Sequence, residues 1–148
     1  MAAPALEIRS RALKLLTTRE HSRLELARKL TRRGYPPSDV EAVLDALEAD
    51  GLLSEERLLA AYVAERLEKG FGPLRIRAEL QAKGLPDAAI DPHLRLDDAQ
   101  CLAMMVDVDC GRFGSSPPND RQTLAKRARF LEYRGFPPSL IARVLDFD

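Results

Sequence analysis

Few residues in this chain of 148 could carry out acid–base, nucleophilic or metal chemistry. The two histidines, His21 and His93, have no acid or nucleophile at a spacing that indicates a catalytic partner. Cys101 and Cys110 lie nine positions apart without neighbours typical of a metal site, so we expect two reduced thiols and no bound metal. Phosphate-binding glycine loops, serine-nucleophile motifs and zinc-protease motifs do not occur. The sequence therefore predicts a protein that is not an enzyme and that needs no cofactor.

Basic side chains are the remaining candidates, because they can bind phosphate groups or an acidic protein surface. The 23 Lys and Arg are balanced by 23 Asp and Glu, which excludes a polycation that coats nucleic acid. The charge is nevertheless uneven, since segments 19–33, 66–83 and 121–134 carry net charges of +4, +3 and +4, whereas 36–50 and 87–109 are acidic. The candidate contact residues are Arg28, Lys29, Arg32, Arg33, Arg66, Lys69, Arg75, Arg77, Lys83, Lys126, Arg127, Arg129 and Arg134.

A simpler interpretation stays open for each of these cations taken alone. Lys and Arg in the last turn of a helix interact favourably with the helix dipole, and Arg32, Arg33, Lys83 and Arg134 are expected in last turns. Because basic residues recur in three segments, a shared binding surface is an equally good interpretation of the whole set.

Aromatic residues are few, since Phe, Trp and Tyr make up 5% of the chain. Stacking on nucleic-acid bases needs such side chains and is therefore weakly indicated. We expect Phe71, Phe113, Tyr133 and the other aromatic residues to pack at helix junctions.

A repeat of about 50 residues must position these side chains. The pattern Leu26-x3-Leu30-x3-Gly34-Tyr35-Pro36 recurs as Ile76-x3-Leu80-x3-Gly84-Leu85-Pro86 and, in part, as Leu131-x3-Gly135-Phe136-Pro137. Apolar residues also recur six and ten positions after each glycine. Such a period indicates tandem structural repeats.

Each repeat is predicted to contain three helices. The first helices are expected at about 8–17, 55–67 and 98–108, and each glycine ends a second helix before a proline opens the third. Ser22-x-x-Glu25 is a capping box, while Pro92 should shorten, restart or kink one third helix. We predict an all-α fold of three tandem three-helix repeats, at 1–53, 54–96 and 97–148, which form an elongated, curved array.

The sequence resembles the RecX family of regulators of RecA recombinase. The residues that carry the resemblance are Arg19-Glu20-His21-Ser22-x-x-Glu25-Leu26-x-x-Lys29-Leu30, Gly51-Leu52-Leu53-Ser54-Glu55-Glu56-Arg57, Lys69-Gly70-Phe71-Gly72-Pro73-x-Arg75-Ile76-Arg77-x-Glu79-Leu80-x-x-Lys83-Gly84, and Phe130-Leu131-x-x-Arg134-Gly135-Phe136. The resemblance implies three three-helix repeats and a negative modulator that binds the RecA filament on single-stranded DNA. It implies inhibition of the ATPase, strand-exchange and coprotease activities of RecA.

The remaining expectations concern partners and location. No uncharged run exceeds the eight residues of 135–142, far below the ~20 apolar residues that cross a bilayer, and no secretory signal is visible. We expect a cytoplasmic monomer with no membrane partner, whose partners are the RecA filament and, through it, single-stranded DNA; weak binding to free DNA stays open. The alternative function is a stand-alone helical DNA-binding module, because two helices joined by a glycine turn are compatible with one.

Overall fold

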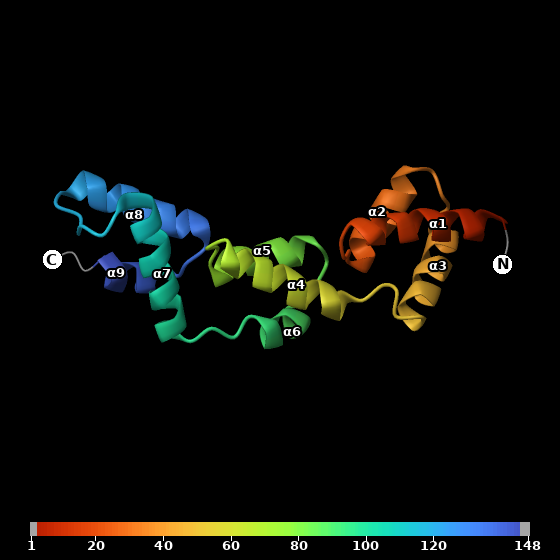
Figure 1. Ribbon diagram of the computed structural model, residues 1–148. Helices are drawn as coiled ribbons and strands as arrows, with labels where there is room; N and C mark the ends of the chain where they lie inside the picture. The colour runs from red at the N-terminus through yellow and green to blue at the C-terminus, as the bar shows by residue number, and fades with distance from the viewer. Residues whose placement is uncertain (1–2, 146–148) are drawn as a thin grey trace. The chain divides into compact units, whose positions relative to one another are not determined.

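The computed structural model describes residues 3–145, and every regular element in that range is helical (Figure 1). The first repeat holds α1 (Ala3–Thr18), α2 (Arg23–Arg32) and α3 (Pro37–Ala49). The second holds α4 (Glu55–Glu68), α5 (Pro73–Ala82), α6 (Asp87–Ile90) and the 3-10 turn η1 (Asp91–His93). The third holds α7 (Asp98–Phe113), α8 (Arg121–Arg134) and α9 (Pro138–Leu145). The prediction of an all-α chain of three three-helix repeats is confirmed.

Local signals set the helix ends. The Ser22 hydroxyl accepts a hydrogen bond from the backbone N–H of Glu25 (3.1 Å), and the Glu25 carboxylate accepts one from the backbone N–H of Ser22 (3.0 Å). This is the predicted capping box at the start of α2. Pro92 limits the third helix of the second repeat to α6 and one 3-10 turn, because proline lacks a backbone N–H.

The described residues form two compact units. One unit joins the chain up to Ala61 with Leu80–Ala89, and the other joins Tyr62–Glu79 with the residues from Ile90 onward. The second repeat therefore contributes residues to both units.

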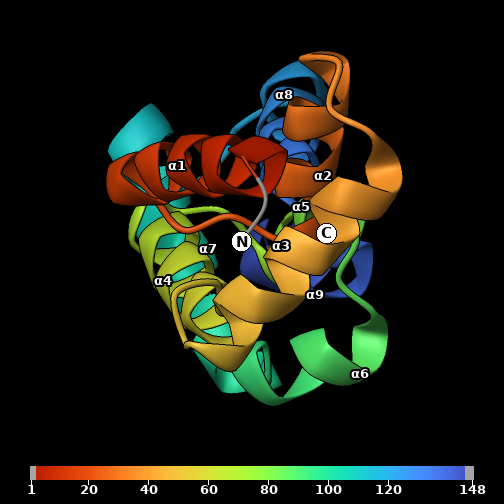
Figure 2. The same ribbon diagram turned by 90° about the vertical axis from the view of Figure 1, so that its right-hand side faces the viewer.

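The core of the first unit lies between α1, α2 and α3, which pack against one another (Figure 2). Burial of a Leu, Ile or Val side chain contributes roughly 1.5–3 kcal/mol, so this cluster is the main source of the unit's stability. Its buried members are Ile8, Ala12, Leu26, Leu30, Val40, Val43, Leu44, Leu47 and Leu53.

The core of the second unit lies between α7, α8 and α9. Cys101 and Met105 lie four positions apart on one face of α7, and both are buried. They pack with residues that repeat the pattern around the third glycine: Leu131, Phe136, Leu140, Ile141 and Leu145.

A joint between repeats lies within the first unit, where the start of α2 meets the residues after α5. The buried Ser22 hydroxyl donates a hydrogen bond to the backbone oxygen of Lys83 (2.6 Å). The Lys83 ammonium donates to the Glu25 carboxylate (3.2 Å), which also accepts from Arg19 (2.8 Å). The capping box of the first repeat therefore also binds the second.

The second unit contains the equivalent joint between α5 and α8. The backbone N–H of Gly72 donates to the oxygen of Arg134 (2.7 Å), and that of Leu74 donates to the oxygen of Gly135 (2.9 Å). A Cβ atom added to Gly72 would lie 2.5 Å from the Gly135 oxygen. Glycine at position 72, where the first repeat has Ser22, is what permits this close approach.

The first joint predicts a pH-dependent stability. Burial alone would raise the pKa of Glu25, but hydrogen bonds from Arg19, the Ser22 backbone and Lys83 lower it from 4.5 to about 2. A depressed carboxyl pKa stabilises the fold above pH 4.5, and this contribution is lost as the pH falls toward 2. We expect the unfolding free energy of the parent to drop by about 2 kcal/mol more than that of Glu25→Gln between pH 5 and pH 3, measured by urea denaturation. Parallel pH curves for the two proteins would contradict this assignment.

Candidate functional site: a guanidinium–aromatic groove

The second unit holds a groove whose walls come from α7, α8 and the turn that follows α4. The carboxylate of Asp97 caps α7 by accepting from the backbone N–H of Gln100 (2.7 Å), and that of Asp120 caps α8 by accepting from the N–H of Thr123 (2.6 Å). Phe113, the last residue of α7, lies against Phe130 of α8. Their ring centroids lie 5.5 Å apart in an edge-to-face contact.

Cations and aromatic rings alternate over this surface, which we call the guanidinium–aromatic groove. Its volume is about 520 Å³. No acidic side chain lines it, and the lining residues are Phe71, Arg75, Arg112, Phe113, Lys126, Arg129, Phe130, Tyr133 and Arg134.

Three arginines surround the ring of Phe71. The guanidinium carbons of Arg66, Arg75 and Arg134 lie 3.7, 4.6 and 4.5 Å from its centroid. Cations at such distances from an aromatic face are attracted by the ring quadrupole. The ring therefore brings cations of α4, α5 and α8 together despite their mutual repulsion.

Hydrogen bonds fix two of these arginines. Arg75 donates to the backbone oxygen of Tyr133 (3.2 Å), and Arg134 donates to that of Lys69 (2.8 Å). Both acceptors are neutral, so these two bonds orient the guanidinium groups without balancing their charge; only Arg75 of the two also pairs with an acid, Glu79. Preorganised guanidinium groups suit anions that accept two hydrogen bonds.

Glu79 forms the acidic support behind the groove. It accepts hydrogen bonds from Arg66 (2.9 and 2.7 Å), Arg75 (3.3 Å) and the hydroxyl of Tyr62 (3.1 Å). Burial would raise the pKa of Glu79, but these bonds outweigh it and lower that pKa. Burial and the bond to Glu79 raise the pKa of Tyr62 to about 12, so Tyr62 stays a neutral donor at physiological pH.

The open side of the groove carries cations without acidic partners. Within residues 3–145, the side chains of Arg112, Lys126 and Arg129 form no ion pair, although Arg112 lies over Phe130. Tyr133 is 70% exposed, which leaves much of its ring open to solvent. The unpaired cations can bind a phosphate, and the exposed ring beside them can stack on a planar base. Phosphate and base are two parts of a nucleotide.

The structure brings four predicted residues together in this groove, Arg75, Lys126, Arg129 and Arg134. Sequence reasoning missed Arg112, because it expected α7 to end near Val108, whereas the helix continues to Phe113. The aromatic residues were expected only to pack at junctions. Phe71 and Phe113 do connect helices, yet they also line the groove with the exposed ring of Tyr133. The Phe-Gly pairs that recur at 71–72 and 113–114 were the sequence feature that could have indicated this second role.

Arg127 serves the fold, and we exclude it from the contact residues. Arg127 and Asp109 are only 5% and 4% exposed. The Arg127 Nε donates to the Asp109 carboxylate (3.0 Å), a second donor bonds the other carboxylate oxygen, and a third reaches the backbone oxygen of Ser116 (2.9 Å). Buried charges need such pairing.

The other predicted cations divide into paired and open groups. Arg66 pairs with Glu79, Lys69 with Glu65, Arg77 with Asp91 and Lys83 with Glu25. In the first unit, Arg28 and Arg32 line a shallow depression on α2. Lys29 and Arg33 line a separate pocket with Arg11 and Lys14 of α1, two cations outside the predicted set.

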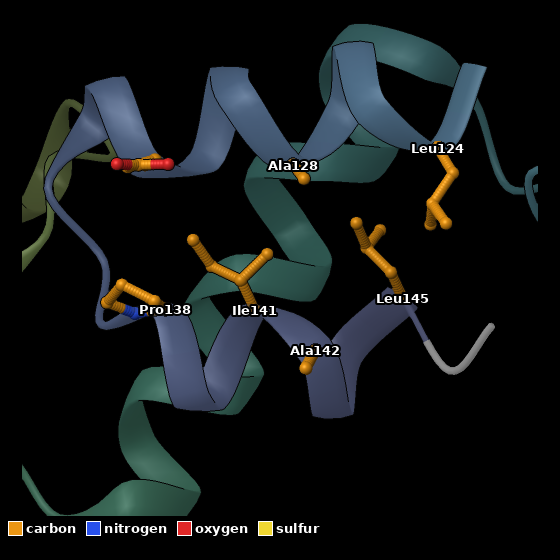
Figure 3. A pocket seen from close by; sticks show the side chains of 7 residues that line it. Leu124, Ala128, Pro138, Ile141, Ala142 and Leu145 are labelled. Carbon is orange, nitrogen blue, oxygen red and sulfur yellow. The ribbon is translucent and has the colours of Figure 1, made fainter. Parts of the chain in front are cut away.

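An apolar groove of about 310 Å³ lies between α8 and α9 (Figure 3). Leu124 and Ala128 project from α8 toward Ile141 and Leu145 of α9. The first repeat has Arg23 at the position of Leu124, and Arg23 there bonds three carboxylates of α3. The third repeat thus lacks the ionic bridge of the first, and its groove offers packing surface without cations.

Residues 3–145 lack a metal-binding cluster and a membrane-spanning helix. No group of three or more His, Cys, Asp or Glu is placed to hold a metal ion. Across the same residues, no helix is both long and apolar enough to span a membrane. Both cysteines are free thiols, Cys101 buried and Cys110 exposed.

Known proteins are similar to this chain in sequence and in fold. Three family models match, described as the first, second and third three-helix domains of RecX, over residues 9–47, 54–94 and 111–145. Regulatory protein RecX of Pseudomonas fluorescens is 44% identical over 138 residues, which cover 93% of this chain and 89% of that protein. Regulatory protein RecX of Halorhodospira halophila is 45% identical over 129 residues, 87% and 80% of the two chains. In fold, the crystal structure of RecX from Lactobacillus salivarius matches with a TM-score of 0.81 at 21% identity, over 99% of both chains.

Proposed function

This chain belongs to the RecX family of regulatory proteins, and we propose that it is a negative modulator of RecA recombinase. It binds the RecA filament on single-stranded DNA and inhibits the ATPase, strand-exchange and coprotease activities of RecA. It acts in the cytoplasm as a binding protein, without catalysis and without a cofactor.

The guanidinium–aromatic groove is the observation that carries this proposal. A nucleoprotein filament offers phosphates and, where bases are unpaired, planar rings. The unpaired side chains of Arg112, Lys126 and Arg129 suit the phosphates, and the exposed ring of Tyr133 suits a base.

The test is a titration of the DNA-dependent ATPase of RecA on single-stranded DNA with the parent and two groove variants. We expect Tyr133→Ala to raise the concentration for half-inhibition about 5- to 150-fold, because stacking contributes roughly 1–3 kcal/mol per base. Arg129→Glu should raise it by at least about tenfold, since it reverses the charge of a phosphate contact.

A matched control lies on the same helix. Arg121 is exposed at the start of α8, outside the groove, and forms no ion pair within the described part of the chain. Arg121→Glu makes the same charge change and should leave inhibition within about twofold of the parent. Equal losses in the Arg121 and Arg129 variants would assign the effect to net charge, and a parent without effect on RecA would overturn the proposal.

The alternative of a stand-alone DNA-binding module rests on the helix–glycine–helix turns at Gly34, Gly84 and Gly135. Direct binding to free duplex DNA separates the two functions. Tight, sequence-selective duplex binding without RecA would favour the module. Weak binding with no sequence preference, together with ATPase inhibition, would favour the modulator.

A further inference from the structure

We propose that the pocket between α1 and α2 binds a phosphate group that carries more than one negative charge. The pocket has a volume of about 200 Å³ and belongs entirely to the first unit. Arg11 and Lys14 of α1 and Lys29 and Arg33 at the end of α2 supply four cations to its lining, which has no acidic side chain. This site is separate from the guanidinium–aromatic groove, and the proposal does not depend on RecA.

In the part of the chain that the structure describes, none of the four cations of this pocket forms an ion pair, although the Glu25 carboxylate acts on Lys29 at longer range. Within residues 3–145, the side chains of Lys14 and Arg33 form neither a hydrogen bond nor an ion pair. Arg11 uses its Nε to donate to the neutral hydroxyl of Tyr35 (2.7 Å), which in turn donates to Glu7 (2.7 Å). The terminal amino groups of Arg11 therefore keep their donors for a ligand.

Arg23, at the start of the same helix, is in contrast neutralised by acids. Its guanidinium group forms ion pairs with Glu41 (2.5 Å), Asp45 (2.7 Å) and Glu48 (2.6 Å). Within the described residues, Lys29 and Arg33, at the other end of this helix, form no ion pair with an acid of α3. Cations at the two ends of α2 thus differ in whether acids of α3 pair with them.

Lys29 is held in the pocket by a neutral partner. Its ammonium lies 2.8 Å from Nε2 of His21, which is only 1% exposed. Nδ1 of His21 lies 3.0 Å from the backbone oxygen of Arg19, and this oxygen can only accept. Nδ1 therefore carries the ring proton and Nε2 accepts from Lys29.

The surroundings of this pair resist further positive charge. Burial lowers the pKa of His21, and repulsion from Arg19 and Lys29 lowers it further. Burial and repulsion from Arg19, Lys83 and Arg32 likewise lower the pKa of Lys29, and attraction to Glu25 offsets this only in part. An anion in the pocket would relieve both effects.

The number of cations indicates the charge of the ligand. One carboxylate or one phosphodiester carries a single negative charge and would leave several of the four cations unbalanced. A terminal phosphate or pyrophosphate carries two or more charges on a compact group. Arginine forks and lysine ammonium groups both suit its oxygens. A free nucleotide and a phosphorylated nucleic-acid end share this group.

The experiment measures binding of inorganic pyrophosphate to the full chain by calorimetry, with variants on α1 and α2. We expect Lys14→Gln combined with Arg33→Gln to weaken binding by at least about tenfold, since two charge-assisted hydrogen bonds are lost. Arg32 is next to Arg33 but lines the other depression, so Arg32→Gln should change the affinity less than about twofold. In parallel, the His21 imidazole pKa, followed by NMR, should rise when pyrophosphate is added to the parent.

No pyrophosphate binding, or equal losses in the two sets of variants, would overturn the proposal. Where pyrophosphate does bind, competition experiments identify the source of the phosphate group. Displacement by ATP alone assigns a free nucleotide, and displacement by a 5′-phosphorylated but not a 5′-hydroxyl oligonucleotide assigns a nucleic-acid end. Equal displacement by both oligonucleotides contradicts the requirement for a multiply charged group. Since RecA is absent throughout, failure here leaves the RecA proposal standing.

Discussion

Arg127→Met is expected to lower the unfolding free energy by about 3–5 kcal/mol, enough to unfold much of a marginally stable chain. The variant replaces the inner part of the side chain with an apolar chain and removes all donors to Asp109, which is 4% exposed and would keep a buried charge without a partner. It also frees the backbone oxygen of Ser116, which Arg127 holds in the loop between α7 and α8. Urea denaturation followed by far-UV circular dichroism measures the loss.

The double variant Asp109→Leu with Arg127→Met separates the missing charge from the missing packing. Because both charges are then absent, we expect it to recover most of the loss, as buried ion pairs replaced by apolar residues often do. Arg129→Met, two positions along the same helix but exposed, should stay within about 0.5 kcal/mol of the parent. A small effect of Arg127→Met alone would show that water hydrates the Asp109 carboxylate and that the fold does not need Arg127. Arg127 would then again be a candidate contact residue.

The repeats were predictable because their signals are local. The capping box at Ser22 and Glu25 and the helix-ending glycines act within one turn of the chain, so residue type and spacing suffice to place them. Pro92 is similar, since the absent N–H shortens a helix whatever surrounds it. Two helix ends were misplaced: α1 begins at Ala3 and not near Ile8, and α7 ends at Phe113 and not near Val108. At the end of α7, Asp109 interrupts the apolar pattern, and its buried pairing with Arg127 is invisible in the sequence.

The candidate site was predictable only in part, because it depends on contacts between repeats. A basic segment shows where cations gather, but not which of them meet an acid from another helix. Arg127 and Arg129 are two residues apart in the same segment, yet one is buried and the other lines the groove. The role of Phe71 follows from the end of α8 meeting the start of α5, a long-range contact that the repeat pattern does not specify.

Gly135→Ala should be the most damaging change that adds a single methyl group. Gly135 has a φ of 98°, which costs a residue with a Cβ roughly 1–2 kcal/mol. An added Cβ would also lie 2.3 Å from Cβ and 2.6 Å from the backbone nitrogen of Arg75, which sits in the first turn of α5 and cannot move without opening the joint. We expect a total loss of about 3 kcal/mol or more, since overpacking adds typically 1–3 kcal/mol.

Gly34→Ala isolates the two contributions. Gly34 has nearly the same φ, 96°, at the same position of the first repeat, but nothing lies within 4 Å of an added Cβ. Its loss should therefore be the conformational cost alone, about 1–2 kcal/mol. The difference between the two variants in urea denaturation measures the close approach of α5 and α8 at the joint.

Because this joint also carries Arg75 and Arg134, Gly135→Ala should weaken RecA inhibition more than Gly34→Ala at temperatures where both variants are folded. Equal losses of stability would mean that the joint yields readily, and the groove would then owe its arrangement to the arginine–Phe71 contacts.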